Sequence, residues 1–386
     1  MAQRAAATTR VEVPFNQPYV TGAELGYIQE AIDNACLSGN GPFSKRCAGL
    51  LEQDLGAEAV LLTHSCTGAL EMAALLADVG PGDEVIMPSF TFSSTATAFV
   101  LRGATPVFVD IREDTLNLDE RLVEEAVTER TRALVAVHYA GVGCDMDALG
   151  AIAERHGLML IEDAAQGFGS AAGGRPLGSL GALGALSFHE TKNVISGEGG
   201  ALILNDPALV QRAEILHEKG TNRRAFFRGQ VDKYSWVDVG SSFLLSELGA
   251  AFLWAQLEQS GWITDQRMLV WQRYHAAFEQ LEHAGLLRRP VVPEDMQHNA
   301  HLYYLLVPGD ERRDETIGAL AREQVSSVFH YVPLHSSPAG RQLGRASGEL
   351  PVTDRTSASL LRLPLWVGMQ DQQVDHVIAA VQHALA

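Results

Sequence analysis

The sequence predicts an α/β protein in which a mostly parallel, seven-stranded sheet forms a large domain and a smaller α+β domain follows at the C-terminal end. Between about residues 58 and 205, short apolar runs alternate with helical stretches. This order is typical of a parallel sheet with helices on its faces. Several of the runs lack period-two alternation, which indicates strands that are buried on both faces.

Seven apolar runs of strand length make up the predicted sheet. They lie at 59–62, 84–88, 106–110, 133–138, 159–162, 182–188 and 201–204. Helical stretches lie between most of them, for example at 67–79 and 118–129. A further helix is expected at about 22–34, before the first run.

A long helical segment at 244–274 is expected to connect the large domain to the small one. The small domain contains apolar runs at 300–307 and 325–330 and a terminal helix near 373–385. We therefore expect three parts, which are a flexible tail (1–13), a large domain with the N-terminal helix (14–260) and a small C-terminal domain (261–386).

Composition excludes several classes of protein. The chain has 386 residues, of which 46% are hydrophobic, and its formal net charge is −18. That charge argues against a broad nucleic-acid surface, which needs clustered Lys and Arg. No run is long and apolar enough to span a membrane, and residues 1–10 lack the apolar centre of a signal peptide, so we expect a cytoplasmic protein.

The cysteines give no sign of a disulfide framework or a metal site. None of them forms a C-x-x-C pair, so neither a structural zinc site nor any other metal is expected. They are Cys36, Cys47, Cys66 and Cys144.

Polar clusters follow five of the predicted strands at the point where each strand ends. They lie at 63–68, 89–92, 138–141, 163–166 and 189–192. In open α/β sheets, ligands bind beyond the carboxyl ends of the strands. The sequence therefore predicts a ligand site at this edge of the sheet.

Lys192 is the candidate nucleophile at that edge. The chain has only four lysines, and a lysine is usually a solvated surface residue. Lys192 differs because it follows an apolar run by a few residues and precedes the glycine-rich segment 197–200. A lysine held in such a loop can form an imine with an aldehyde cofactor, because partial desolvation lowers its pKa.

Two further features fit an aldehyde cofactor that carries a pyridine ring and a phosphate. Asp163 follows an apolar run, where a carboxylate can keep a pyridine nitrogen protonated or simply cap a turn. The segment 63–68 ends a strand and opens a helix, whose free N–H groups suit a phosphate. Ser187 can add a hydroxyl to the phosphate site, and Phe92 can lie on the ring, although an aromatic residue at a strand end is more often part of the core.

Ordered segments along nearly the whole chain carry a resemblance. They are PGDEVIMPSFTFSSTA, TPVFVDIREDTLNLD, IEDAAQGFGS, SFHETKN followed by GEGGA, and YVPLHSSPAG. With these segments the chain resembles the DegT/DnrJ/EryC1/StrS family of sugar aminotransferases, from Pro14 to the last predicted helix. The resemblance implies the aspartate-aminotransferase fold (fold type I) and the cofactor pyridoxal 5′-phosphate (PLP).

The resemblance also implies roles for particular residues. Lys192 is the catalytic residue that forms the imine and moves the proton. Asp163 pairs with the ring nitrogen, Gln166 contacts the ring hydroxyl, and Phe92 covers the ring. The remaining cofactor contacts are assigned to Cys66, Thr67, Gly68, Ser187 and Ser242.

One segment departs from the family pattern. Many members carry a G-Y-N-Y-R-type segment whose Asn reaches the phosphate of the partner subunit. Here the corresponding residues are Gly240-Ser241-Ser242-Phe243-Leu244. Ser242 can still donate a hydrogen bond, but Leu244 cannot replace the Arg, so the usual contacts between subunits are in doubt.

The implied reaction transfers the amino group of L-glutamate to the keto carbon of dTDP-4-keto-6-deoxyglucose and gives dTDP-4-amino-4,6-dideoxygalactose. Family members are homodimers in which the partner chain completes each site. We expect the sugar nucleotide to contact His189, His330 and His335, and its diphosphate to meet a basic loop, although a charged loop that is merely solvated is equally common. The loop residues are Lys219, Arg223, Arg224 and Arg228.

Two other interpretations remain open. One is a PLP enzyme that acts on another keto sugar or on an amino acid, and the other is a non-catalytic regulator on the same fold. The presence of Lys192, Asp163 and Gln166 together weighs against the regulator. Family members that act as sugar dehydratases have a His in place of the imine lysine, so Lys192 favours transamination.

Overall fold

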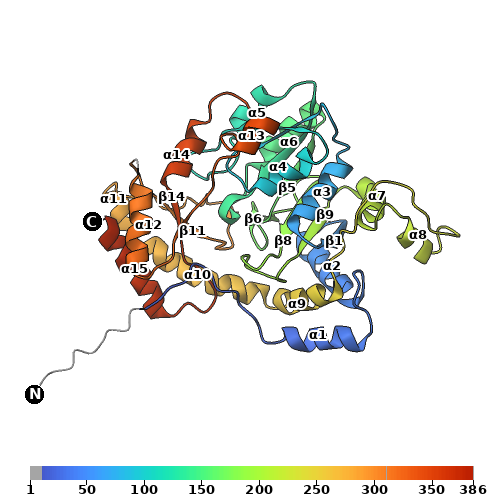
Figure 1. Cartoon of the computed structure of the whole chain (residues 1–386), viewed down its shortest axis with the longest axis horizontal. Coiled ribbons are helices and arrows are strands. Elements are labelled where there is room, and N and C mark those ends of the chain that lie inside the picture. Colours follow the sequence, from blue (N-terminus) through green and yellow to red (C-terminus); the bar gives the residue numbers. More distant parts are fainter. Residues whose placement is uncertain (1–10, 310, 386) are drawn as a thin grey trace, which may run out of the picture.

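The computed structural model describes residues 11–309 and 311–385, which contain one large sheet, a small sheet in the C-terminal part and a third sheet of two-residue strands (Figure 1). The large sheet contains all seven predicted strands. They are β1 (Ala59–Thr63), β2 (Glu84–Pro88), β3 (Thr105–Val109), β4 (Thr131–Val137), β5 (Met159–Asp163), β8 (Leu183–Ser187) and β9 (Gly200–Leu204). The predicted mixed α/β fold with a large, mostly parallel sheet is confirmed.

The strand order of the large sheet is β1-β9-β8-β5-β4-β2-β3-β13. β9 pairs antiparallel with both of its neighbours, whereas β8, β5, β4, β2 and β3 pair in parallel. The edge strand β13 (Arg345–Ala346) was not predicted, because two residues are too few to show a period. It comes from the sequence range assigned to the small domain and pairs in parallel with β3.

Helices cover both faces of the large sheet, which explains why most positions of its strands are apolar. Alternate residues of β4 point to opposite faces. Val135 packs in a cluster with α3 (Cys66–Leu76), α4 (Ser93–Val100) and α7 (Pro207–His217). Leu134 packs in another cluster with α5 (Glu120–Ala126) and α6 (Met146–His156). The second face is completed beside β1 and β9 by α2 (Pro42–Leu55) and α9 (Glu247–Leu257).

The small sheet belongs to the C-terminal part of the chain. Its strands β11 (Tyr303–Leu306), β14 (Leu360–Leu363) and β12 (Val328–Phe329) lie in that order and are antiparallel. Their core is shared with α10 (Ser260–Ala277), α12 (Arg312–Arg322) and α15 (Asp371–Leu385). The predicted runs 300–307 and 325–330 and the terminal helix 373–385 therefore contain β11, β12 and most of α15.

The prediction of one long helix at 244–274 is wrong in one respect, because the structure has two helices there. α9 ends at Leu257, and α10 begins at Ser260 after Gln259 takes φ −115° and ψ 11°, outside the α-helical range. Figure 1 shows α9 beside the large sheet and α10 beneath the small one, so the pair still connects the two parts of the molecule.

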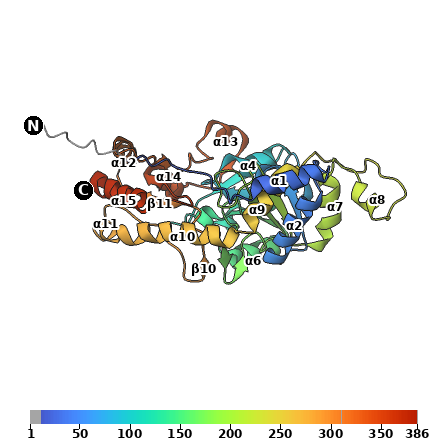
Figure 2. The same cartoon turned by 90° about the horizontal axis from the view of Figure 1, so that it is seen from below.

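The remaining elements are short or lie at the surface. α1 (Glu24–Asp33) corresponds to the helix expected at 22–34 and packs against α9. α8 (Arg223–Phe227) projects from the body of the molecule, as Figure 2 shows. The others are η1 (Tyr139–Gly141), α11 (Glu279–His283), α13 (Pro338–Leu343), α14 (Pro351–Ser359), and a third sheet of β10 (Met296–Gln297), β6 (Ala171–Ala172) and β7 (Arg175–Pro176).

One sequence expectation concerns the N-terminal end of the chain. The flexible tail was placed at 1–13, and residues 1–10 lie outside the described residues. Val13 is fully buried and lies beside Val325 in a parallel bridge, so the chain is already held at that point.

Among the described helices, none has the length and apolar character needed to cross a bilayer.

Asp110, a buried residue directly after β3, ties the small sheet to the carboxyl edge of the large one. Its carboxylate accepts hydrogen bonds from the Val352 N–H (3.0 Å), the Thr353 N–H (2.8 Å) and the Thr353 hydroxyl (2.7 Å). These donors lie in the first turn of α14, and α14 runs directly into β14. The position of β14 against the large sheet therefore depends on this carboxylate.

We predict that Asp110→Ala lowers the free energy of unfolding by about 2–4 kcal/mol, because it leaves the buried N–H and hydroxyl of Thr353 and the partly buried N–H of Val352 without their acceptor. The measurement is urea unfolding followed by circular dichroism. Asp265→Ala, at an exposed position of α10, is the matched control and should change the midpoint little. Equal midpoints for the two variants would contradict the tethering role of Asp110.

Candidate active site

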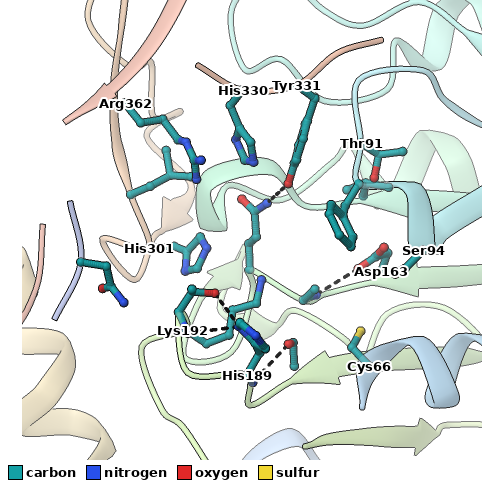
Figure 3. Close-up of a pocket in the computed structure, with 18 of the residues that line it drawn as sticks. Cys66, Thr91, Ser94, Asp163, His189, Lys192, His301, His330, Tyr331 and Arg362 are labelled. Carbon is teal, nitrogen blue, oxygen red and sulfur yellow. Dashed lines mark hydrogen bonds between the residues drawn. The ribbon is translucent and has the colours of Figure 1, made fainter. Parts of the chain in front are cut away.

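A cavity of about 380 Å³ lies at the carboxyl edge of the large sheet, where the sequence predicted a ligand site. Its walls come from the turns after β1 and β2, from the ends of β5 and β8, and from β14 of the small sheet. Figure 3 shows that Arg362 and His301 lie on the opposite side from Cys66 and Ser94, with Lys192 between them. The cavity is thus enclosed by both parts of the molecule.

Asp163 ends β5 and is buried at the floor of the cavity. One carboxylate oxygen accepts a hydrogen bond of 2.7 Å from the Thr95 hydroxyl, and the other accepts the Ala165 N–H at 3.1 Å. Thr95 is held in turn by Thr91, whose hydroxyl lies 2.8 Å away. The carboxylate is therefore fixed in orientation and retains acceptor capacity toward the cavity.

Glu162, the residue before Asp163, lies fully buried beneath this floor. Its carboxylate accepts the N–H groups of Gly178 (2.8 Å), Leu180 (2.6 Å) and Gly181 (2.6 Å). It also lies 2.8 Å from Nε2 of His138, the residue after β4. Because Nδ1 of His138 accepts the Cys144 N–H, we assign the proton to Nε2, which donates to Glu162.

Gln166 is held by both ends of its amide. Its Oε1 accepts the Ala140 N–H at 2.7 Å, and its Nε2 donates to the Tyr331 hydroxyl at 2.9 Å. Tyr331 follows β12, and burial raises the pKa of its phenol, so the hydroxyl stays protonated. The small domain is thereby joined to the loop after β5 by a hydrogen bond inside the cavity.

The N-terminus of α3 forms a cup of donors at the other end of the cavity. Ser65 caps the helix by accepting the Gly68 N–H at 3.0 Å, and the Thr67 hydroxyl donates to Ser94 at 2.8 Å. In the described part of the chain, the N–H groups of Cys66 and Thr67 have no acceptor. Together with the Ser187 hydroxyl at the end of β8, these groups suit an anion.

Lys192 lies in the connection between β8 and β9, and its side chain lines the cavity. Asn193 anchors this connection by donating from Nδ2 to the Asn299 carbonyl at 2.8 Å. Burial lowers the pKa of the Lys192 amine, and the charge of Arg362 adds to this, while Cys66 and Asp163 act in the opposite direction. A larger share of the amine is therefore neutral than in a solvated lysine.

The wall formed by the small domain carries two histidines, His301 and His330, and two arginines, Arg267 and Arg362. His301 donates from Nδ1 to Oδ1 of Asn193 (3.1 Å), and Nδ1 of His330 lies 3.1 Å from the Tyr139 hydroxyl. Burial and the nearby positive charges, including Lys192 and Arg362, hold the pKa of both imidazoles well below the usual range. Both rings are therefore neutral, and the positive charge of this wall comes from Arg362 and from Arg267, whose guanidinium donates to the carbonyls of Ala300 and His301.

The structure brings most of the predicted site residues to the cavity. Those that line it are Cys66, Thr67, Phe92, Asp163, Gln166, Ser187, His189, Lys192 and His330. Phe92 is 60% exposed and precedes α4, so its ring is free to cover a bound ligand. Gly68 does not line the cavity, because its N–H is used by Ser65 and its backbone packs against His64, where an added Cβ would come within 2.9 Å of the ring.

Other predicted residues lie away from the cavity of their own chain. His335 contacts Ser89, whose Oγ lies 2.7 Å from Nδ1. The loop cations are near α8, where Arg224 and Arg228 form ion pairs with Glu214 and the Arg223 guanidinium lies 5.2 Å from the centre of the Phe227 ring. The residues that this cavity does not include are Gly68, Lys219, Arg223, Arg224, Arg228, Ser242 and His335.

Several residues that line the cavity, and Thr95, which holds Asp163 in place, were not identified from the sequence. Thr95 and Ser94 lie one turn beyond the predicted cluster 89–92, and the helical pattern there gives no sign of their role. Tyr331 and His301 come from irregular segments whose position depends on the packing of the two domains. Arg362 could have been recognised from the sequence. A single charged residue between Leu361 and Leu363 in a strand is expected to face away from the core.

Because its pKa is lowered, Lys192 should react with an amine reagent at a lower pH than the exposed lysines Lys45, Lys219 and Lys233. We expect trace labelling of the coenzyme-free protein with acetic anhydride, read by peptide mass spectrometry across pH, to give Lys192 the lowest midpoint. A midpoint at or above that of the three reference lysines would contradict the burial effect.

The chain is similar to known proteins over nearly its whole length. The family model described as the DegT/DnrJ/EryC1/StrS aminotransferase family matches residues 18–382. The chain is 37% identical over 380 residues to the spore coat polysaccharide biosynthesis protein SpsC of Bacillus subtilis (strain 168), with 96% of each chain covered.

Solved structures show the same fold. The aminotransferase TlmJ from Streptoalloteichus hindustanus has a TM-score of 0.89 and 31% identity, covering 97% of this chain and 99% of that one. The proposed sugar aminotransferase Spr1654 from Streptococcus pneumoniae, in its pyridoxamine phosphate (PMP) form, has a TM-score of 0.89 and 26% identity, covering 97% and 98%. Its PLP form has a TM-score of 0.88 and 27% identity, covering 97% and 100%. The chain therefore belongs to the DegT/DnrJ/EryC1/StrS aminotransferase family, the family that its ordered sequence segments resemble.

Proposed function

We propose that this protein uses PLP to transfer an amino group from L-glutamate to the keto carbon of a nucleotide-linked sugar, with Lys192 as the catalytic residue. The observation that carries the proposal is the convergence of Lys192, Asp163 and the α3 cup on one cavity, each at the end of a different strand. The relationship to SpsC, a spore coat polysaccharide biosynthesis protein, supports a sugar as the acceptor.

The residues of the cavity fit the functional groups of PLP. The unused N–H groups of Cys66 and Thr67 and the nearby hydroxyls suit its phosphate. The fixed Asp163 carboxylate suits the pyridine nitrogen, and the partly desolvated amine of Lys192 suits the aldehyde. Gln166 and Phe92 would then contact the ring, as the family resemblance implies.

Bound PLP would supply an electron sink for the carbon that gains or loses the amino group. The protein's own residues would do the remaining work. Asp163 would keep the ring nitrogen protonated, and Thr95 holds that carboxylate in place. Lys192 would take a proton from the substrate carbon and return it, a role for which a lowered pKa is suitable and which typically contributes about 10²- to 10⁴-fold to the rate.

For the acceptor, we propose dTDP-4-keto-6-deoxyglucose, with dTDP-4-amino-4,6-dideoxygalactose as the product. The segments HETKN, EKGTNR, FFRGQVDKY and GSSFLLSE resemble those of the dTDP-4-amino-4,6-dideoxygalactose transaminase of enterobacterial common antigen synthesis. Three of these segments lie near α8 and one contains Lys192. This resemblance supports the same sugar nucleotide as the acceptor.

The test is incubation of the PLP-loaded protein with L-glutamate and a panel of keto-sugar nucleotides. We expect equimolar 2-oxoglutarate and an amino sugar nucleotide, whose configuration nuclear magnetic resonance would assign. Borohydride reduction followed by peptide mapping should find the coenzyme on Lys192. Lys192→Ala should abolish both results, and Lys45→Ala, at an exposed position of α2, should preserve them.

Coenzyme attached elsewhere would overturn the proposal. Amino transfer only to keto acids would indicate an amino-acid transaminase, and coenzyme binding without any transfer would indicate a regulator.

We further propose that the active form is a homodimer in which the region around α8 reaches the partner's cavity. Arg223 and Lys219 do not line the cavity of their own chain, and Arg223 has no ion pair within the described residues. The projecting segment also exposes large apolar side chains, with Phe227 70% and Trp236 79% exposed. A second copy of this chain would cover these side chains and receive the cations.

Mixed dimers test this arrangement. Arg223→Ala with Arg228→Ala should raise the KM for the sugar nucleotide far more than the KM for glutamate. A dimer of this double variant with Lys192→Ala should regain one working site, because an intact loop then meets an intact Lys192. Placing all three substitutions on one chain beside a wild-type chain should give low activity. The reverse pattern would show that the loop acts within its own chain.

A further inference from the structure

We propose that Asn299 is a positioning residue that fixes Lys192 and Gln166 relative to each other, through one buried cluster of hydrogen bonds between the small-domain range and two loops of the large sheet. This inference rests on the proposed role of Lys192 as the imine-forming residue. It gives a function to a buried amide that does not line the cavity and belongs to none of the predicted cofactor or sugar contacts.

Asn299 uses both polar atoms of its side chain. Its Nδ2 donates to the carbonyls of Gln166 and Phe168, each at 2.8 Å, and its Oδ1 accepts the His301 N–H at 3.0 Å. These partners assign the orientation of the amide, because a reversed amide would place Oδ1 against two carbonyl oxygens. Gly141 packs against the same Oδ1 so closely that an added Cβ would overlap with it. The side chain of Asn299 is therefore held in one orientation.

One side of this cluster holds Gln166, which lies in the turn after β5. Its backbone carbonyl is bound by Asn299, and its side-chain Oε1 accepts the Ala140 N–H at 2.7 Å. The carbonyl of Phe168, two residues later, is bound by the same Nδ2 of Asn299. The position of this turn therefore follows the position of Asn299.

The other side of the cluster holds the connection that carries Lys192. The backbone carbonyl of Asn299 accepts a hydrogen bond of 2.8 Å from Nδ2 of Asn193, the residue next to Lys192. Oδ1 of Asn193 accepts Nδ1–H of His301 at 3.1 Å. Both ends of the buried Asn193 amide are thus bound to the segment 299–301, so the backbone beside Lys192 is fixed to that segment.

Arg267 of α10 supports the segment 299–301. Its guanidinium is 4% exposed and donates from Nε to the Ala300 carbonyl (3.1 Å) and from Nη2 to the His301 carbonyl (2.6 Å). Ala300 has φ +50°, in the left-handed region that is strained for an alanine. The buried guanidinium stabilises this turn, and the turn in turn presents the groups that bind Asn193.

The cluster joins two residues that would contact neighbouring groups of the coenzyme. Lys192 would react with the aldehyde of PLP, and Gln166 would contact the hydroxyl on the adjacent ring carbon, as the family resemblance implies. Asn299 binds the carbonyl of Gln166 directly and the residue after Lys192 through Asn193. A reacting group that is displaced by about 1 Å can lose on the order of 100-fold in rate. The cluster therefore aligns the amine before the coenzyme arrives.

The first measurement needs no coenzyme. Trace labelling with acetic anhydride across pH reports how far burial lowers the pKa of the Lys192 amine. We expect Asn299→Ala and Asn193→Ala each to move the Lys192 midpoint upward, toward those of the exposed reference lysines, because a loosened connection lets water reach the amine. The double variant should move the midpoint no further than the larger single change, since both substitutions break the same link.

The charges around the amine stay the same in these variants, so a shift reports burial. The ionisable groups that face Lys192 come from several elements, and no variant substitutes any of them. They are Cys66 on α3, Asp163 at the end of β5, Arg362 on β14, and the imidazoles of His301 and His330.

The second measurement is the rate at which PLP becomes attached to the coenzyme-free protein, read by borohydride reduction and peptide mapping. We expect Asn299→Ala to slow attachment to Lys192 about 10- to 100-fold, while excess PLP still gives the wild-type final amount. Asn193→Ala breaks only two side-chain hydrogen bonds, so it provides the same measurement if Asn299→Ala does not fold.

Asn117→Ala is the matched control. Asn117 is as buried as Asn299, its Nδ2 donates to the carbonyls of Val142 and Gly143, and its Oδ1 accepts the Tyr139 N–H. None of these bonds reaches the connection that carries Lys192. Asn117→Ala should therefore lower the Tm about as much as Asn299→Ala and leave both Lys192 measurements unchanged.

An unchanged Lys192 midpoint in Asn193→Ala and Asn299→Ala, or additive shifts in the double variant, would overturn the inference. Equal shifts in Asn117→Ala would assign the effect to lost stability and overturn it as well. Wild-type protein that attaches no PLP at Lys192 would refute the proposed function, and the labelling midpoints would still decide whether Asn299 positions the amine.

Discussion

The floor of the site depends on the hydrogen bonds that the buried carboxylate of Glu162 accepts. It collects three backbone N–H groups from the loop 178–181 and the imidazole of His138, so it fixes the ends of β4 and β5 against the connection that leads to β8. A buried carboxylate is tolerated only when its acceptor sites are filled, and here they are. Asp163 is the next residue, and its orientation follows from this arrangement.

Much of the fold could be predicted from the sequence because the large sheet is buried on both faces. Runs such as 159–162 and 201–204 stand out without any polar alternation, and their order fixes a mostly parallel sheet. The same logic placed Lys192, Asp163 and Ser187 at one edge, since parallel strands end together. These predictions depended on the local sequence pattern and on the rule that parallel strands end at the same edge of a sheet. The structure agrees with both.

The missed residues depend on contacts between distant segments. Tyr331 and His301 reach the cavity only because the small domain is docked by Asp110 and α14, and no local pattern encodes that docking. The break between α9 and α10 was missed because Gln259 is an ordinary helix former whose conformation is set by its surroundings. The loop around α8 shows a basic pattern in the sequence, and in the structure it lies away from the cavity of its own chain, where Arg224 and Arg228 pair with Glu214.

The direction of β9 has a consequence for the loop that carries Lys192. Because β9 runs antiparallel beside β8, the residues between them form a hairpin connection and not a crossover through a helix. Both ends of that connection are anchored in adjacent strands of the same sheet, so Lys192 lies in a loop whose two ends are fixed. The hairpin therefore restricts the amine from the side of the large sheet, and the hydrogen bonds of Asn193 with Asn299 and His301 restrict it from the side of the small-domain range.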